Sequence, residues 1–361
     1  MPSSSLSSST TRTRAAVFCG PGRISVEEIN LRGHGDRSGD KGNTGDQILK
    51  VRSCCVCGYD ARVFRNGHRK VNPPVVLGHE ICAETTNDLS SIKAGTRVAV
   101  YPVLPCLKCR YCELKRYNLC LDIKEIGSTL DGGFAEYIRI PKEIVQIGGL
   151  VAVPDGLSDE EASLIEPLAC CLNGFSQING PLGKDSSVAI IGDGPMGLLH
   201  LQLSKNLLGT RTVVIGKTPE RMAAAKSLGA DKVFSADNHQ VSEILQSNGR
   251  SGHDLIVVAT SEPSALDLAV KIASKGSCIN VFAGIKGNSS ALDPNLIHYN
   301  QISVNGSFSS TPDSFKRAVQ LASGKIVDLS KMVTHRYSLD AISEAISVTE
   351  SYNGLRAAVS P

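Results

Sequence analysis

The strongest constraint on the fold of this chain is a run of alternating strands and helices between residues 187 and 284. Ser187–Ile191 is a short apolar segment of the kind that forms a buried strand, and a helical pattern follows it. The segments that continue the alternation are predicted strands at Thr212–Ile215, Leu255–Ala259 and Ser277–Phe282, and predicted helices at Pro195–Leu208, Pro219–Leu228 and Pro263–Ala273. Strands joined by helices pair in parallel, and helices then cover both faces of the sheet. We therefore expect an α/β fold with a doubly wound parallel sheet.

A glycine-rich turn joins the first of these strands to its helix. The segment Gly192-Asp193-Gly194-Pro195-Met196-Gly197 has the spacing GxGxxG, and its place between a strand and a helix is the context of a dinucleotide-binding turn. Glycines let the backbone approach a pyrophosphate, and the N–H groups and dipole at the helix start hold its negative charge. The alternative is a glycine-rich turn that only packs the helix against the strand. We favour the dinucleotide site, and its predicted residues are Gly192, Gly194, Pro195, Met196 and Gly197.

The part of the chain before this run has a different sequence pattern. Short apolar segments interrupted by Gly and Pro are typical of a β-rich domain with long loops. These segments are Ala15–Phe18, Ile48–Val51, Arg97–Tyr101 and Tyr137–Ile140, and the polar stretch Gly33–Asp46 is expected to be a surface loop. After Gly284, Phe315–Ala322 and Leu339–Thr349 have the periodicity of amphipathic helices.

The composition excludes several classes of protein. With 361 residues, of which 41% are hydrophobic and 20% charged, the chain is long enough for about two globular domains and is not a disordered protein. A formal net charge of +3 and 4% aromatic residues argue against nucleic-acid binding. No stretch reaches the roughly 18 apolar residues that a bilayer requires, so we expect a soluble protein without a membrane partner. Residues 1–13 form a Ser/Thr-rich tail without the apolar segment of a secretion signal, so we expect a disordered tail and a cytoplasmic protein.

Four of the twelve cysteines lie close together in the chain. Cys106, Cys109, Cys112 and Cys120 have the spacing C-x2-C-x2-C-x7-C, which favours metal ligation in a reducing compartment over disulfides. Four thiolates fill the tetrahedral shell of one zinc ion and leave no place for a substrate, so this site would be structural. The alternatives are a chance cluster of thiols and an iron–sulfur cluster.

A second group of candidate ligands is scattered along the chain and comprises Cys57, His79, Glu80 and Glu166. Each residue alone is a weak signal, because a lone cysteine is more often a buried apolar residue and a glutamate is usually solvated or paired. Together, thiolate, imidazole and carboxylate suit a zinc ion that keeps a coordination position for water or a substrate oxygen. The group therefore predicts a catalytic zinc site.

The order of these motifs resembles that of the medium-chain zinc-dependent alcohol dehydrogenases. The motifs that match are Cys57, Gly78-His79-Glu80, the four-cysteine run, Asp131–Tyr137, Glu166-Pro167 and the glycine-rich turn. The His-Glu pair and the Glu-Pro-Leu motif resemble most the polyol (sorbitol) and threonine dehydrogenase branch. The resemblance covers nearly the whole chain from Ala15. It implies a GroES-like β-rich catalytic domain over residues 14–167 and 300–361, a Rossmann cofactor domain over residues 168–299, and a homodimer or homotetramer.

Carried over residue by residue, the resemblance implies that Cys57 and His79 bind the catalytic zinc, with Glu80 and Glu166 sharing the remaining positions. Which carboxylate binds the metal at rest stays open. The chain departs from the family at Tyr59, where relatives have a Ser or Thr whose hydroxyl relays the alcohol proton. We predict that the Tyr59 phenol takes the relay role, and the alternative is that it only narrows the pocket.

A second departure concerns the cofactor. The second Rossmann strand ends at Gly216, where relatives carry an acidic residue that accepts hydrogen bonds from the ribose of NAD and repels the 2′-phosphate of NADP. Lys217, Thr218 and Arg221 follow, so two cations, a hydroxyl and helix N–H groups are predicted to converge on a phosphate. In the alternative interpretation Lys217 and Arg221 are solvated surface charges. We predict that NADP is favoured over NAD.

These motifs together predict an enzyme with two zinc ions per chain, one catalytic and one structural. It would transfer a hydride between NAD(P) and an alcohol, which is a polyol, a cyclitol, an amino alcohol or a hydroxy amino acid, and would produce a ketone or aldehyde. One alternative is a non-catalytic protein of the same fold that binds zinc and dinucleotide, with Tyr59 filling the pocket. The other is a zinc-free quinone reductase, which is disfavoured because it lacks these metal ligands.

Overall fold

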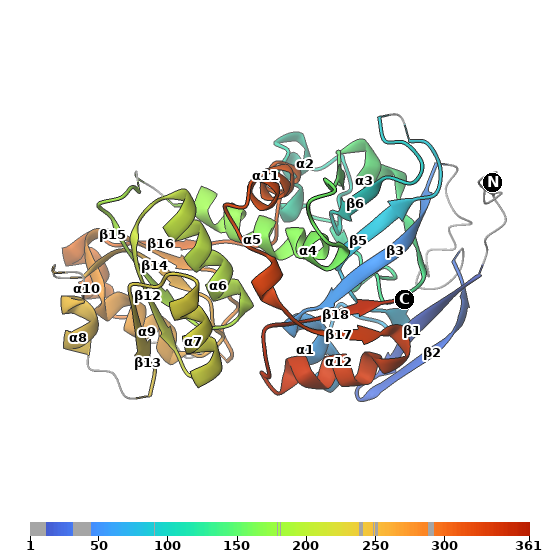
Figure 1. Cartoon of the computed structure of the whole chain (residues 1–361). Coiled ribbons are helices and arrows are strands. Elements are labelled where there is room, and N and C mark those ends of the chain that lie inside the picture. The colour runs from blue at the N-terminus through green and yellow to red at the C-terminus, as the bar shows by residue number, and fades with distance from the viewer. Residues whose placement is uncertain are drawn as a thin grey trace. The chain divides into compact units, whose positions relative to one another are not determined.

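The computed structural model describes residues 12–31, 45–89, 91–178, 180, 182–237, 241–247, 249, 252–287 and 292–361. These residues form two compact units (Figure 1). The first comprises the described residues up to Ala169 together with Ser310–Ser323 and Leu329–Pro361. The second comprises Cys170–Ser309 and Gly324–Asp328. Residues 1–11 of the predicted tail and most of the predicted loop Gly33–Asp46 lie outside the described residues, whereas Arg12 and Thr13 begin strand β1 (Arg12–Gly20).

The first unit is rich in β structure. Its seven-stranded sheet has the order β10-β6-β5-β3-β18-β17, and β9 also pairs with β3. These strands are β3 (Gln47–Val56), β5 (Glu80–Thr85), β6 (Arg97–Val100), β9 (Tyr137–Ile140), β10 (Leu150–Ala152), β17 (Val333–Ser338) and β18 (Arg356–Ser360). The other strands are β1, β2 (Arg23–Asn30) and β4 (Val75–Val76), which form a three-stranded sheet, and the pair β7 (Val103–Leu104) and β8 (Lys124–Glu125). Because β18 pairs with β3, segments from both ends of the sequence complete one sheet.

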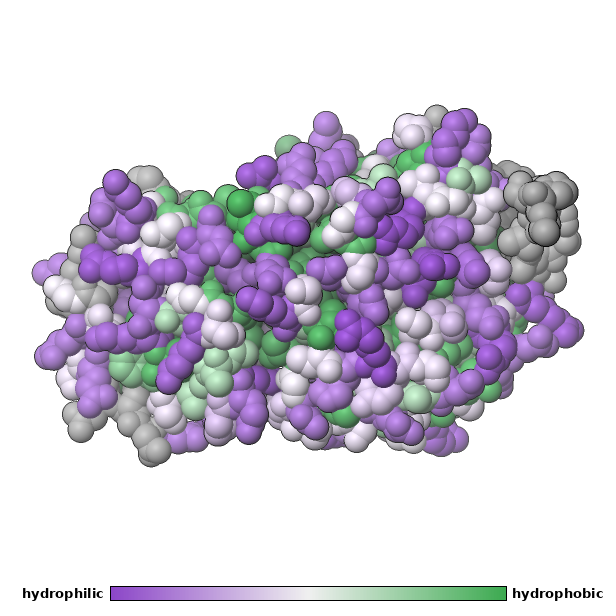
Figure 2. Space-filling model, in the orientation of Figure 1, coloured by the Kyte–Doolittle hydropathy of each residue, from purple (hydrophilic) through white to green (hydrophobic). Residues whose placement is uncertain are grey.

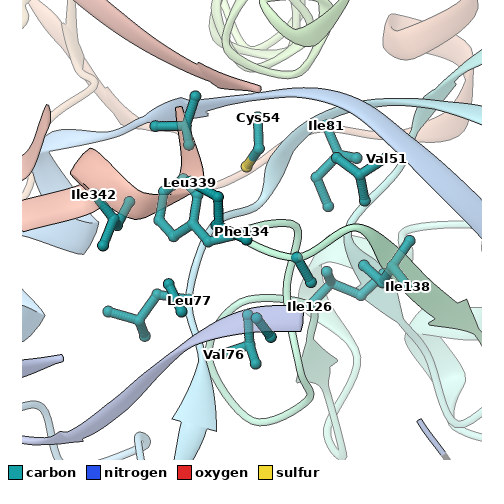
Figure 3. Packing of buried hydrophobic residues seen from close by; sticks show 14 of the residues in the cluster. Val51, Cys54, Val76, Leu77, Ile81, Ile126, Phe134, Ile138, Leu339 and Ile342 are labelled. Carbon is teal, nitrogen blue, oxygen red and sulfur yellow. The ribbon is translucent and has the colours of Figure 1, made fainter. Parts of the chain in front are cut away.

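Apolar side chains from these strands and loops form the core of the first unit. Phe134 is fully buried, and Leu77, Ile81 and Ile126 are no more than 1% exposed in the same cluster (Figure 3). The helices of this unit are α1 (Gly58–Asn66), α2 (Arg110–Glu113), α3 (Lys142–Gln146), α4 (Asp159–Ser163), α11 (Pro312–Ser323) and α12 (Ile342–Glu350), with short 3-10 turns at Tyr117–Leu119, Ser330–Met332 and Leu339–Ala341. Helix α5 (Ile165–Ser176) starts in the first unit and ends in the second.

The second unit contains a six-stranded sheet in which every neighbouring pair is parallel, in the order β13-β12-β11-β14-β15-β16. Its strands are β11 (Ser187–Ile191), β12 (Arg211–Gly216), β13 (Lys232–Ser235), β14 (His253–Val258), β15 (Ala273–Val281) and β16 (Ser303–Gly306). Its helices are α6 (Pro195–Gln202), α7 (Pro219–Ser227), α8 (Val241–Gln246), α9 (Ser264–Lys271) and α10 (Pro294–Asn300). The predicted combination of a β-rich domain with a parallel-sheet domain is confirmed.

Two details differ from the sequence-based expectation. The segment Pro195–Leu208 was expected to be one helix, but α6 ends at Gln202 and a π-helical turn, η2 (Leu203–Leu207), follows. The catalytic domain was expected to resume at residue 300, but β16 pairs with β15 as the last strand of the parallel sheet, so the first unit resumes at Ser310.

The face of the molecule shown in Figure 2 carries mainly hydrophilic residues, with hydrophobic ones between them. Within the described ranges, every helix is too short or too polar to cross a bilayer.

Candidate active site

Three candidate metal ligands meet in the first unit. Cys57 lies directly before helix α1, Glu80 is the first residue of β5, and His79 precedes it. Their potential ligand atoms all lie within 4.8 Å of one another. The sheet register explains why the three residues are close, because Cys55 near the end of β3 is paired with Glu80 at the start of β5. The residues that follow β3 and those that precede β5 therefore lie next to each other.

The buried carboxylate of Asp60 contacts residues of this cluster and fixes their positions. Asp60 is fully buried, and it accepts hydrogen bonds from the backbone N–H of Cys57 at 2.8 Å and of Gly78 at 3.3 Å. Its Oδ1 lies 3.5 Å from Nδ1 of His79, which leaves Nε2 of the imidazole for a metal. Burial lowers the pKa of His79, but Asp60 and Cys57 together outweigh burial and hold that pKa well above its ordinary value. Asp60 thus orients a ligand without being one.

Glu80 forms an ion pair with Arg356 of β18. Nη2 of Arg356 donates to Oε1 of Glu80 at 2.7 Å, and both residues are buried. Burial raises the pKa of Glu80 to about 7, although the Arg356 guanidinium opposes the shift. Oε2 of Glu80 has no hydrogen-bond partner among the described residues. A buried carboxylate oxygen without a partner, beside a thiol and an imidazole, fits a zinc ion, because burying a polar atom is costly unless something binds it.

Glu166 lies in the first turn of α5 and is 7% exposed. It is not one of the three residues whose ligand atoms lie within 4.8 Å of one another. Its negative charge still raises the pKa of Glu80, so the two carboxylates are close enough to influence each other. The structure thus brings Glu80 into the cluster and leaves Glu166 outside it.

Tyr59 adjoins the cluster in the first turn of α1. Its ring meets the His79 ring edge-on, with 5.9 Å between the centroids. The phenol oxygen lies 3.0 Å from the buried hydroxyl of Ser128 and 3.4 Å from Nδ1 of His68, which is exposed. Burial raises the pKa of Tyr59. A path of hydrogen bonds therefore leads from the buried Ser128 through the Tyr59 hydroxyl to the exposed His68, beside the candidate metal cluster.

The four-cysteine run forms a separate lobe around α2 and the 3-10 turn Tyr117–Leu119. All four potential ligand atoms lie within 4.8 Å of one another, and Sγ of Cys109 is 3.6 Å from that of Cys112 and 4.0 Å from that of Cys120. Hydrogen bonds from the backbone of Leu121 and Cys112 lower the pKa of Cys109 to about 6, which favours its thiolate. None of the twelve cysteines, all of which lie among the described residues, forms a disulfide. The lobe has the donor set of a closed tetrahedral zinc site.

In the second unit, the glycine-rich turn follows β11 and opens α6. Gly192 has a φ of +124°, and a Cβ at this position would lie 2.8 Å from the carbonyl oxygen of Ala259. A Cβ on Gly197 would collide with the carbonyl oxygen of Gly192. Gly194 is the N-cap residue of α6 and Pro195 is its first residue, followed by Met196. Only glycine allows this close approach of strand, turn and helix, which is the geometry of a dinucleotide-binding turn.

The residues after β12 that were predicted to bind a phosphate, Lys217, Thr218 and Arg221, differ in their burial and in their partners. Arg221 is only 7% exposed, so it is not a solvated surface charge. Lys217 is a surface charge: its Nζ lies 3.7 Å from Oδ1 of Asp237, and both side chains are more than half exposed. Thr218 is the N-cap residue of α7. The backbone N–H groups of Lys217 and Thr218 donate to Asp193, at 2.9 and 2.7 Å. These two donors are therefore already engaged.

Sequence reasoning did not assign roles to Asp60, Arg356, Ser128, His68 or Asp193. Asp60 had a signal, because it stands in the Cys57 motif at the third position of a helix, where a carboxylate reaches back to the N-cap N–H. Arg356 could have been found from a weaker signal, because it is a cation within a short apolar segment, Leu355–Val359. Nothing in the local sequence indicated a role for Ser128, His68 or Asp193.

Comparisons with known proteins agree with this geometry. Residues 43–153 match the family model described as the alcohol dehydrogenase GroES-like domain, and residues 195–324 match that of the zinc-binding dehydrogenases. The chain is 30% identical over 312 residues to a sorbitol dehydrogenase of Bacillus subtilis (strain 168), covering 84% of this chain and 86% of that protein. It is 30% identical over 323 residues to a D-arabitol-phosphate dehydrogenase of Enterococcus avium, covering 87% and 89%. A zinc-binding dehydrogenase from Sinorhizobium meliloti 1021, solved with NADP bound, matches with a TM-score of 0.86 and 26% identity over 98% of this chain and 100% of that one.

Proposed function

Because the chain belongs to the medium-chain zinc-dependent alcohol dehydrogenase family, in its polyol branch, we propose that it oxidises an alcohol reversibly by transferring a hydride to NAD(P). The observation that best supports the reaction is the cluster of Cys57, His79 and Glu80, in which the buried Oε2 of Glu80 has no partner among the described residues. Three of the four predicted ligands, Cys57, His79 and Glu80, come together, which disfavours a non-catalytic protein of the same fold.

We assign the zinc ligands as follows. Cys57, His79 and Oε2 of Glu80 would hold the catalytic ion, and Glu166 would share the remaining coordination position, as the resemblance implies. When bound, zinc supplies Lewis acidity toward the substrate hydroxyl. Asp60 keeps the His79 ring in place, and Arg356 orients Glu80 and opposes the rise that burial causes in its pKa. Cys106, Cys109, Cys112 and Cys120 hold a second, structural zinc, giving two ions per chain.

The substrate class we propose is a polyol, cyclitol, amino alcohol or hydroxy amino acid. Its support is the polyol branch, since similar proteins act on sorbitol and on a phosphorylated arabitol. The test is a screen of these four classes with NAD and NADP, run beside zinc analysis of the purified protein. Zinc-dependent reduction of either cofactor by at least one class is expected. Two zinc ions per chain with no activity on any class would instead favour the non-catalytic alternative.

We also propose that the protein is a cytoplasmic homodimer or homotetramer. Strand β16 is at one edge of the parallel sheet, and Tyr299 before it and Phe308 after it are 77% and 49% exposed. An edge strand flanked by exposed aromatic side chains favours association with a second copy. The free thiols favour a reducing compartment.

For the cofactor we propose that NADP is favoured over NAD. The support is the absence of an acidic side chain at Gly216 and the presence of two cations, the exposed Lys217 and the buried Arg221. The measurement is the ratio of kcat/KM for the two cofactors with one substrate. A wild-type enzyme that prefers NAD by about tenfold, a difference of about 1.4 kcal/mol, would contradict this proposal.

Replacing Tyr59 by Phe tests the relay role proposed for the phenol. The substitution removes the hydroxyl that contacts Ser128 and His68 but keeps the ring against His79. Turnover is expected to fall by roughly 10²-fold or more, the scale of general acid–base effects. The control is His68→Gln, which interrupts the path only at its exposed end and should have the smaller effect. Unchanged turnover in Tyr59→Phe would leave Tyr59 a steric role only.

A further inference from the structure

Gly216 ends β12 without a side chain, and a neighbouring residue fills the space. The parallel strands β11 and β12 pair Ile191 with Ile215, so the residues that follow each strand lie together. A Cβ placed on Gly216 would be 2.6 Å from both Cβ and Oδ2 of Asp193. Contacts this short cannot be accommodated. The glycine at position 216 is therefore explained by the Asp193 side chain, which occupies the place where a residue at 216 would project.

The Asp193 carboxylate is fixed in this place. Its Oδ2 accepts hydrogen bonds from the backbone N–H of Lys217 at 2.9 Å and of Thr218 at 2.7 Å, and the residue is 8% exposed. These N–H groups lie at the start of α7, where the helix dipole also favours an anion. The carboxylate thus takes the position that an external phosphate would need, and Oδ1 takes part in neither hydrogen bond.

We infer that Asp193, a residue of the glycine-rich turn, is the carboxylate that discriminates between the two nicotinamide cofactors in this protein. The inference rests on the proposed function as an NAD(P)-dependent enzyme. Oδ1 of Asp193 is an acceptor for a ribose hydroxyl, whereas a 2′-phosphate meets a fixed like charge and two N–H donors that are already engaged. Lys217 and Arg221 act in the opposite direction, by attracting the phosphate. The proposed NADP preference therefore depends on these two cations, and the Asp193 carboxylate limits it.

Replacing Asp193 by Asn removes the charge and keeps the shape, and the amide oxygen can still accept from Lys217 and Thr218. The ratio of the dissociation constants of NADH and NADPH, measured by nicotinamide fluorescence without substrate, is expected to shift toward NADPH by about tenfold or more. The same shift is expected in calorimetry with ADP and 2′,5′-ADP, which report the adenosine end alone. Asp193→Ser, which keeps a short acceptor for the two N–H groups, should shift both ratios in the same direction.

The matched control is Asp237→Asn. It removes a carboxylate that also faces Lys217, at 3.7 Å, but one that is 66% exposed in its side chain. Because exposed pairs contribute little, this variant should change the ratios by no more than roughly threefold. Unchanged ratios in both Asp193 variants, or equal shifts in Asp193→Asn and Asp237→Asn, would overturn the inference while leaving the proposed function intact. A wild-type protein that binds none of the four nucleotides would overturn the proposed function itself.

Discussion

Replacing Cys57 by Ser is expected to abolish alcohol oxidation and to leave the protein folded. Cys57 is partly exposed beside the metal cluster and is not one of the buried hydrophobic residues of the core, so its loss costs little packing. A hydroxyl is a much poorer zinc ligand than a thiolate, and Lewis-acid stabilisation is worth several kcal/mol. We expect kcat/KM to fall by about three orders of magnitude or more, and the zinc content to fall from two ions per chain to one.

The matched control is Cys19→Ser, which changes another partly exposed cysteine, located in β1 of the same unit. It should keep both zinc ions and most of the activity. Circular dichroism and thermal unfolding of Cys57→Ser should resemble those of the wild type. If Cys57→Ser retained both ions, or more than about a tenth of the activity, the assignment of Cys57 to the catalytic zinc would be wrong.

The second large effect is expected from Cys109→Ser in the lobe, and it concerns stability rather than chemistry. The lobe has little apolar core of its own, because Leu107, Leu114 and Leu121 are 38%, 63% and 73% exposed. A structural zinc contributes folding free energy directly. Losing only about 3 kcal/mol of it would lower Tm by roughly 6–12 °C in a domain of this size.

Three measurements check this expectation. Scanning calorimetry should show the lower Tm, and limited trypsin digestion should cleave the lobe faster, at Lys108, Arg110, Lys115 or Arg116. Zinc analysis should find one ion per chain in the variant. A wild-type protein with a single zinc, together with a Cys109→Ser variant as stable as the wild type, would contradict the two-site assignment.

The sequence was informative where a structural requirement is local. The glycine-rich turn could be placed between β11 and α6 because the spacing of Gly192, Gly194 and Gly197 reflects contacts within one strand-turn-helix unit. The four-cysteine lobe could be recognised for the same reason, since all its candidate ligands lie between positions 106 and 120. The family and the fold class followed from the order of such local patterns.

The sequence was uninformative where a role depends on pairing between distant segments. Arg356 reaches Glu80 only because β18 pairs with β3, and 276 positions separate the two residues. Asp193 occupies a variable position of the GxGxxG pattern, so nothing in the motif indicates that it fills the space beside Gly216. The absence of a carboxylate at Gly216 was therefore visible in the sequence, but the presence of the Asp193 side chain beside it, from the turn after β11, was not.

The pairing of β18 with β3 also has a consequence for how the protein is made. Domains generally fold as units during synthesis, beginning with the N-terminal one. Here the second unit, Cys170–Ser309 and Gly324–Asp328, leaves the ribosome before β17 and β18 emerge. Until then the segment Cys54–Val56 of β3 lacks its β18 partner, and Glu80 has no Arg356 to balance its charge. The four cysteines of the lobe are therefore all synthesised early in translation, whereas the cluster of Cys57, His79 and Glu80 gains the ion pair with Arg356 only after β18 has been made.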